Sequence, residues 1–362
     1  MNNESVKLKL HNILGKQLKV KNIFNAVLAV QSGNRNIDWV GAIGDTNHIE
    51  KAKMQVDTPY FIASITKMYT STVIMHLRER NLLNLDDPIS KYLPASLIKG
   101  IHSYKAVDYV SELKIVHLLS HTSGLADYFL QKQKDGENIL DKIVSNGDYE
   151  WNVNEVITIV REDLTPKFKP GDGKKAYYSD TNYQLLGTII ESITKKSLSE
   201  VYNEIIIIPL RLQNTYLFSL SSQQARPQPA QIFYEEKVMN MPKAMSSFGP
   251  DGGIVSTVHE SLTFLRAFLD GTLFPEHYLE EMKQWKRIFF PLEYGYGLMR
   301  FKLPRIFSPF QASPEFIGHS GASSSFLFYC PDEDLYLTGT LNQVKKQSRP
   351  FRLMIDVINA LK

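Results

Sequence analysis

The chain has 362 residues, 43% of them hydrophobic and 22% charged, which is typical of an ordinary globular protein. Its net charge of +3, without a basic run interleaved with aromatics, gives no indication of nucleic-acid binding. A single cysteine, Cys330, excludes an internal disulfide, and no stretch approaches the length of a membrane span. The first residues lack the apolar segment of a signal peptide. This predicts a cytoplasmic protein for the chain as given, and a periplasmic or extracellular one if a leader has been removed.

The predicted elements place strands at both ends of the chain and helices between them. A helix over 4–17 precedes two strands, over 24–31 and 37–44. The middle of the chain is helical, with clear stretches over 111–120, 153–162, 181–196 and 198–207. A helix over 258–269 is followed by strands over 294–303, 324–329 and 335–341 and by a final helix over 349–361.

This order predicts an α+β fold in which both chain ends build one antiparallel sheet flanked by helices. We divide the chain into two regions. Residues 1–80 and 245–362 form the sheet region, which carries Ser64 and His319. Residues 81–244 form a mostly helical insert, which carries Tyr178. The cleft between the two regions is the expected active site.

Ser64-Ile-Thr-Lys67 lies where an extended apolar stretch turns into an apolar helix. Serine and lysine three residues apart on a helix share one face, so a desolvated Lys67 could take the Ser64 proton. The Ser-x-x-Lys spacing also begins at three other serines, which are Ser96, Ser111 and Ser192. Their surroundings indicate a short loop, a helix N-cap and the last turn of a helix. The helix that follows Ser64 is what distinguishes it.

Two further motifs supply what a serine nucleophile needs. Tyr178, in a glycine-containing loop, could relay a proton between the serine and the leaving group. In Gly318-His-Ser-Gly-Ala, we expect His319 on an edge strand, where it could donate to a substrate carbonyl or carboxylate. Gly321 would permit a close backbone approach, and the amide of Ala322 could serve as an oxyanion donor.

Three motifs, taken in order, resemble those of the serine β-lactamase and penicillin-binding-protein superfamily: Ser64-x-x-Lys67, Tyr178-Ser-Asp180 and His319-Ser-Gly321. The subgroup resembled contains class C β-lactamases, DD-carboxypeptidases, D-aminopeptidases and related esterases. Supporting landmarks include Leu118-Leu-Ser-His-Thr-Ser-Gly-Leu and Gly252-Gly-Ile-Val-Ser-Thr. The likeness extends from about Phe24 to Leu341.

The resemblance implies a role for each matching residue. Ser64 would be acylated, Lys67 would act as the base or hold Tyr178 ionised, and Tyr178 would deliver the proton. The backbone amides of Ser64 and Ala322 would form the oxyanion hole, and a water would later free the acyl group. The remaining motif residues would bind substrate: Asp180, His319, Ser320 and Gly321. No metal or organic cofactor is implied.

Two departures from the family pattern shift the expected chemistry. The second motif usually ends in asparagine, but Asp180 only accepts hydrogen bonds when ionised and can pair with Lys67. The third motif begins with His319, where β-lactamases usually carry lysine, and histidine is mostly neutral at pH 7. Both departures favour peptide or ester hydrolysis over efficient β-lactam hydrolysis.

Rival interpretations rest on isolated patterns. Gly318-His-Ser320-Gly-Ala resembles a nucleophile elbow, which requires a strand, a tight turn and a helix, but a strand is predicted to follow. His117 and His121 have a spacing seen in zinc sites, yet no third ligand is evident, which favours a packing role.

The sequence therefore predicts a serine hydrolase that works through an acyl-enzyme on a small-molecule or peptide substrate. D-Amino-acid peptides or small esters are the expected substrates, with penicillins as slow acylators. A genuine class C-like β-lactamase and a catalytically weak penicillin-binding sensor stay open as alternatives. The sequence leaves the oligomeric state open.

Overall fold

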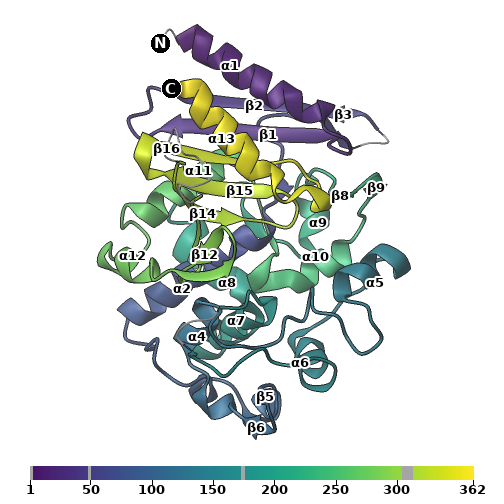
Figure 1. The fold of residues 1–362 in the computed structure, drawn as a ribbon, viewed down its shortest axis with the longest axis vertical. Coiled ribbons are helices and arrows are strands. Elements are labelled where there is room, and N and C mark those ends of the chain that lie inside the picture. Colours follow the sequence, from purple (N-terminus) through teal and green to yellow (C-terminus); the bar gives the residue numbers. More distant parts are fainter. Residues whose placement is uncertain (1–2, 48–49, 173–175, 304–312) are drawn as a thin grey trace.

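The protein is described by a computed structural model that covers residues 3–47, 50–172, 176–303 and 313–362. Strands from both chain ends gather in one large sheet, and the helices of the middle region lie beyond it (Figure 1). This arrangement confirms the predicted α+β fold with an antiparallel sheet built from both ends. In the described ranges, no helix is long and apolar enough to cross a membrane.

The large sheet joins the two chain ends through the pairing of β1 with β16. Within the described residues its strands follow the order β11 (Lys286–Phe289), β12 (Leu292–Tyr294), β13 (Met299–Phe301), β14 (Phe316–Ser320), β15 (Ser325–Cys330), β16 (Leu335–Thr340), β1 (Asn25–Ser32), β2 (Asp38–Asn47) and β3 (Ala52–Lys53). Neighbouring strands are antiparallel.

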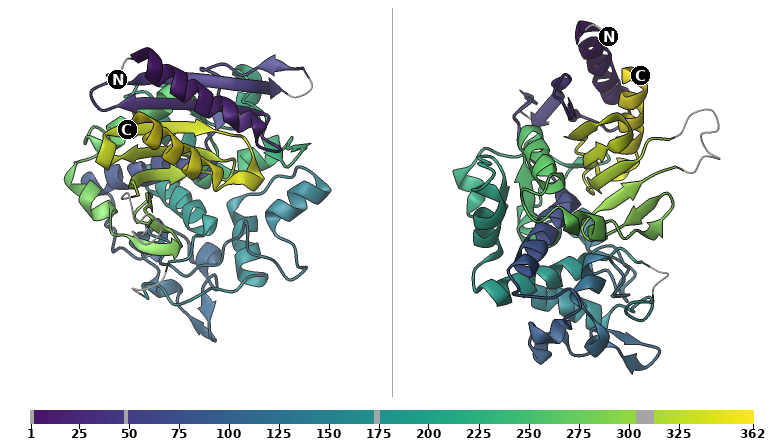
Figure 2. Two further views of the ribbon diagram at one scale, coloured as in Figure 1. Left: turned by 45° about the horizontal axis from the view of Figure 1, so that its top comes forward. Right: turned by 90° about the vertical axis from the view of Figure 1, so that its left-hand side faces the viewer.

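Alternation along β1 explains why helices cover both faces of this sheet. Leu28 packs in a core with residues of α1 (Asn3–Gly15) and α13 (Arg349–Leu361). Val27 points to the opposite face, in a core shared with α2 (Thr66–Glu79) and α11 (Val258–Leu269). Figure 2 shows α1 and α13 side by side across one face of the sheet.

The other elements complete the layers around the site. The remaining helices are α3 (Ala95–Ile98), α4 (Ile115–Leu119), α5 (Ile139–Asn146), α6 (Val153–Glu162), α7 (Asp180–Thr194), α8 (Leu198–Tyr202), α9 (Ser222–Ala225), α10 (Pro242–Phe248) and α12 (His277–Met282). A small sheet has the order β4 (Tyr60–Phe61), β10 (Ile254–Ser256) and β7 (Tyr216–Leu217). Two hairpins pair β5 (Ser103–Tyr104) with β6 (Val107–Asp108) and β8 (Phe233–Tyr234) with β9 (Lys237–Val238).

Two local expectations are wrong. The segment 294–303 forms two strands, because the chain reverses at Gly297, whose φ of 75° suits glycine. His319 lies on β14, an internal strand, because β11–β13 extend the sheet beyond it. The division of the chain into two regions stays a prediction.

Candidate active site

Ser64 lies in a tight turn that connects β4 to α2. The residues Ala63–Ile65 form one 3₁₀ turn, and α2 begins at Thr66. Ala63 adopts a φ of 49°, a left-handed conformation that is costly for a non-glycine residue. Lys67 follows one turn later, is fully buried, and places its Nζ 3.1 Å from Ser64 Oγ. The turn therefore joins an accessible hydroxyl to a desolvated lysine.

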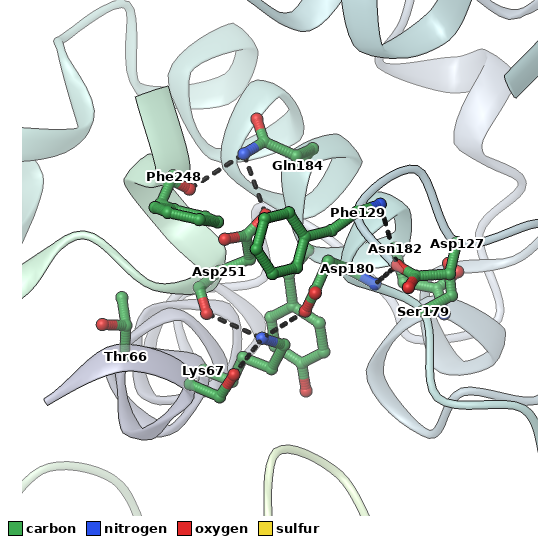
Figure 3. Close-up of polar contacts among 12 residues, drawn as sticks. Thr66, Lys67, Asp127, Phe129, Ser179, Asp180, Asn182, Gln184, Phe248 and Asp251 are labelled. Atoms are coloured by element: carbon green, nitrogen blue, oxygen red, sulfur yellow. Dashed lines mark hydrogen bonds and ion pairs between the residues drawn. The ribbon is translucent and has the colours of Figure 1, made fainter. Parts of the chain in front are cut away.

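Lys67 is held as an ammonium ion. Its Nζ lies 2.7 Å from Asp180 Oδ1 and donates to the backbone carbonyl of Asp251 at 2.7 Å (Figure 3). Burial alone would lower the pKa of Lys67, but its neighbours, the Asp180 carboxylate ahead of Tyr178 and Asp251, raise it above its ordinary value. A lysine in this state is a fixed cation beside the nucleophile rather than a free base.

Asp180 and Asp251 contact this ammonium, and a third buried aspartate, Asp127, contacts the backbone of Asp180. Asp251 Oδ2 accepts hydrogen bonds from Tyr128 Oη at 3.0 Å and from Gln184 Nε2 at 2.9 Å. Burial and then Asp180 raise the pKa of Asp251 well above its usual range, although Lys67 opposes this. Asp127 Oδ1 accepts from the backbone amide of Asp180 at 2.9 Å, and burial followed by Asp180 raises its pKa to about 7. Two of the three carboxyls thus favour the protonated form, and Asp180 is the direct counterion of the lysine.

Tyr178 approaches Lys67 from the segment that precedes α7. Lys67 Nζ lies 5.1 Å from the centroid of the Tyr178 ring. Burial raises the pKa of the Tyr178 hydroxyl, Lys67 lowers it, Asp180 raises it, and the net result lies above the ordinary value. Among the described residues its hydroxyl makes no hydrogen bond of ordinary geometry, but Ser64 and Lys67 lie close enough to lower its pKa. Tyr178 is thus a neutral phenol whose proton is available to a substrate.

His121 fixes the segment that carries Tyr178. Its Nδ1 accepts from the backbone amide of Ser179 at 3.1 Å and lies 2.9 Å from Asn182 Nδ2. The His121 ring lies 4.4 Å from that of Tyr178. Because an amide N–H can only donate, the proton of neutral His121 resides on Nε2, and burial followed by Lys67 holds the pKa well below its usual value. The packing role expected of His121 is accordingly a positioning role, and the described residues contain no cluster of metal-ligating side chains.

The turn after β14 is fastened to the nucleophile turn. A Cβ added to Gly321 would lie 2.6 Å from the carbonyl oxygen of Ile62 and 2.9 Å from Ala63 Cβ, so only glycine fits at this approach. Ser325 Oγ donates to the carbonyl of Ile62 at 2.8 Å. Ala322 consequently lines the same cavity as Ser64, where the expected oxyanion donors belong.

His319 does not reach that cavity. Its side chain is fully buried, with Nδ1 2.7 Å from the carbonyl of Ser320 and Nε2 3.1 Å from Tyr294 Oη. Burial and then Lys67 lower the pKa of His319 to about 3, so the ring is neutral. The expectation that His319 itself contacts substrate does not match this geometry, because both ring nitrogens are engaged within the protein. Ser320, at the end of β14, does line the cavity.

The cavity at Ser64 is mostly apolar and encloses about 200 Å³. Tyr178 and Asp180 line it beside the serine. Its apolar wall includes Phe129, Phe248, Phe289, Met241, Met245 and Met299. No lysine, arginine or histidine is present among the described residues that line it. The described part of the lining is therefore suited to an apolar group and supplies no basic side chain to a substrate carboxylate.

The decoy motifs have structural roles. Ser192 lies in α7, and its hydroxyl donates to the carbonyl of Tyr92 at 2.7 Å. Ser320 is followed by a turn and by strand β15, so the helix that a nucleophile elbow requires is replaced by a strand. Asp127 and Asp251 were missed by sequence reasoning, although each adjoins a landmark segment on which the family resemblance rests.

The fold and the pairing of a serine with a buried lysine define the class of serine hydrolases. The model of the family described as Beta-lactamase matches residues 12–357, so the chain belongs to the Beta-lactamase family.

Several relatives are similar to this chain. A D-stereospecific amidohydrolase from Streptomyces sp. superposes with a TM-score of 0.75 over 99% of this chain and 98% of that chain, at 25% identity. A D-amino acid amidase from Ochrobactrum anthropi SV3 superposes with a TM-score of 0.78 over 98% of both chains, at 21% identity, which shows the fold alone. Teichoic acid D-alanine hydrolase from Staphylococcus aureus is 29% identical over 196 residues, 54% of this chain and 42% of that protein. The chain spans less than half the length of the curated relatives it matches.

Proposed function

We propose that the protein is an acyl-enzyme hydrolase that cleaves amides or esters of small apolar acyl groups, with D-amino acid derivatives as the favoured class. The observation that carries this proposal is Ser64 Oγ, 3.1 Å from the buried Lys67 ammonium, at the wall of an apolar cavity. Relatives named for D-stereospecific amide hydrolysis and for D-alanine hydrolysis support the substrate class.

The protonation states favour a relay through Tyr178. Ser64 Oγ attacks the carbonyl carbon and passes its proton to Tyr178 Oη, while Tyr178 gives its own proton to the leaving nitrogen or oxygen. The bond from the carbonyl carbon to the leaving group then breaks, and the acyl group stays on Ser64. Tyr178 begins and ends neutral, so its raised pKa does not hinder this route. Lys67 remains a cation that stabilises the negative charge developing nearby.

Deacylation reverses these roles. A water attacks the acyl-enzyme, its proton passes through Tyr178 to Ser64 Oγ, and the acid is released. The backbone amides of Ser64 and Ala322 stabilise the oxyanion in both steps. His319 acts through Tyr294, which lies 5.7 Å from Tyr178 between ring centroids, as a positioning residue.

The lining of the cavity supports a ranking of the substrates that the sequence left open. Penicillins and D,D-dipeptides carry a carboxylate, whereas D-amino acid amides and simple esters do not. The described lining contains no basic residue, and Lys67 is already paired with Asp180, so a substrate carboxylate gains no ion pair from these residues and anionic substrates are disfavoured. We therefore rank amides and esters first and penicillins as slow acylators.

A substrate panel tests this proposal. Wild-type protein and Ser64→Ala are incubated with D- and L-phenylalanine amide, p-nitrophenyl acetate, a D,D-dipeptide and nitrocefin, and acyl adducts are followed by intact mass. We expect turnover of the neutral substrates with a D preference, and none in Ser64→Ala. Turnover that persists in Ser64→Ala, or nitrocefin hydrolysis faster than that of every ester and amide, would contradict the proposal.

A penicillin-binding sensor is the second candidate. The Asp180–Lys67 ion pair favours it, because a lysine held as an ammonium ion is a poor base for activating a deacylating water. An adduct with fluorescent penicillin that persists for hours, without turnover of any amide or ester, would support the sensor over the hydrolase.

A further inference from the structure

A second, more polar cavity lies next to the catalytic one. It encloses about 330 Å³ and is bordered by the end of β2, by the segment 228–232 and by the segment 239–242. The backbone amide of Ala230 donates to the carbonyl of Pro59 at 2.9 Å, and that of Gln231 donates to the carbonyl of Thr46 at 2.9 Å. These bonds fix one wall of the second cavity to the strand segments around it.

The two cavities share part of their walls. Ile232, Met241 and Met245 line both of them. Met245 belongs to a cluster with Phe218, which lines the second cavity, and with Phe248, which lines the catalytic cavity. The partition is thus made of apolar side chains only, and two of them are methionines.

Methionine makes this partition adaptable. Its side chain is unbranched and has three rotatable bonds, so it can withdraw at low cost where a branched side chain cannot. Met241 is half-buried and precedes the first residue of α10, whereas Met245 is buried within that helix. Met241 is therefore the member of the wall that can move with the least loss of packing.

The second cavity differs from the first in chemistry. Five residues with side-chain amides border it, together with Glu50: Asn47, Gln223, Gln228, Gln231 and Asn240. Two of these amides also bond within the protein, since Asn47 Oδ1 accepts from the backbone amide of Glu50 at 3.1 Å and Gln228 Nε2 donates to the carbonyl of Gln223 at 2.6 Å. An amide side chain both donates and accepts hydrogen bonds, so it complements the backbone of a peptide. No lysine or arginine occurs among its described lining residues. A ligand that spans both cavities would be apolar near Ser64 and would carry uncharged peptide-like amides further away.

We propose that the second cavity is a distal subsite for peptidic acyl donors, and that Met241 and Met245 set the acyl length that the enzyme accepts. This inference rests on the proposed function, because it assigns the acyl group to the cavity at Ser64. Tyr178 lines only the catalytic cavity, and the proposal places the leaving group at Tyr178 and directs the acyl group toward the shared wall.

The test uses p-nitrophenyl esters with a constant leaving group. The acyl groups are acetyl, nonanoyl and N-acetyl-6-aminohexanoyl, the last two having equal chain length but only one having a distal amide. The measured quantity is the ratio of kcat/KM for each long ester to that for acetate. In wild-type protein we expect the amide ester to be preferred over the nonanoyl ester.

Two substitutions probe the partition in opposite directions. Met241→Ala should raise both long-to-acetyl ratios by about tenfold, which is what room for an extra methylene typically contributes. Met241→Trp should lower them. Met299 is the matched control because it lines only the catalytic cavity, so Met299→Ala should change the esters alike and leave the ratios within about twofold. Thermal melting of each variant reports whether it folds.

A third substitution probes the distal amides. Asn240 is exposed and lines only the second cavity, so Asn240→Ala should reduce the preference for the amide ester over the nonanoyl ester. The subsite would be overturned if the long-to-acetyl ratios of kcat/KM are the same in wild type, Met241→Ala and Met241→Trp. If the acetate ester is still hydrolysed through Ser64 in that case, the proposed function stands. Failure of the wild-type protein to be acylated by any of the three esters would instead overturn the proposed function.

Discussion

Replacing Asp180 by asparagine should release Lys67 from its ammonium state. The carboxylate lies 2.7 Å from Lys67 Nζ, and Coulomb's law with an effective dielectric constant of 20 gives about 6 kcal/mol for such a pair. That energy corresponds to about four powers of ten in proton affinity. Burial is already the largest single influence on this pKa, and in the variant the strongest opposing charge is gone, so desolvation of the fully buried lysine disfavours its charged form. We expect the pKa of Lys67 in Asp180→Asn to fall below its ordinary value.

The lowered pKa of Lys67 determines how the stability of the variant changes with pH. The unfolded chain then binds more protons than the native state between the lowered pKa and the ordinary one. The free energy of unfolding of Asp180→Asn should accordingly rise with pH in that window. At pH 6, where Lys67 is charged and its partner is missing, we expect a loss of about 3 kcal/mol relative to wild type. Urea denaturation of the variant and of wild type from pH 6 to 10 measures both effects.

The pH–rate profile of the same variant separates two roles for Lys67. If Lys67 acts as a cation, as the relay through Tyr178 requires, kcat/KM for p-nitrophenyl acetate should fall as pH rises through the lowered pKa. If Lys67 acts as the base, kcat/KM should rise instead. A rising profile would refute the cationic role. A profile and a stability that match wild type at every pH would refute the claim that Asp180 sets the charge of Lys67.

Three further predictions follow from the same geometry. Lys67→Ala and Tyr178→Phe should each lower turnover of p-nitrophenyl acetate by about a hundredfold or more, as steady-state kinetics would show; an unchanged rate would remove that residue from the mechanism. Gly321→Ala places a Cβ 2.6 Å from a carbonyl oxygen, so we expect urea denaturation to show a loss of about 1–3 kcal/mol in the free energy of unfolding, and most acylation to be lost. The control Gly15→Ala, which has open space around its Cβ position, should change neither the stability nor the acylation. Because the pKa of Asp127 is raised to about 7, its stabilising contribution is present at pH 4 and lost as pH rises through 7. Asp127→Asn should remove that loss, so equal pH dependence of the melting temperatures in variant and wild type would contradict it.

The sequence predicts those parts of the site that depend on neighbours along the chain. Ser64 and Lys67 are three positions apart where a 3₁₀ turn leads into α2, and this spacing allows the 3.1 Å contact between Ser64 Oγ and Lys67 Nζ. Glycine at 321 likewise indicated a close approach, and the structure places it against the carbonyl of Ile62. The fold class could also be predicted from the sequence, because strand patterns occur at both ends of the chain.

The parts that sequence reasoning missed depend on residues distant along the chain. Asp251 contacts Lys67 from 184 positions away, and the landmark segment that it adjoins does not indicate this contact. The chemistry of His319 suits a substrate ligand on an edge strand. However, β11–β13 extend the sheet beyond β14, so His319 lies on an internal strand. The His319 ring is buried and contacts Tyr294 Oη through Nε2, and burial lowers its pKa so that it stays neutral. The charge state of this site is a property of burial and of through-space neighbours. It therefore required the three-dimensional structure to show that the lysine is the only cation beside the nucleophile among the described residues, and that the aspartate of the second motif is its counterion.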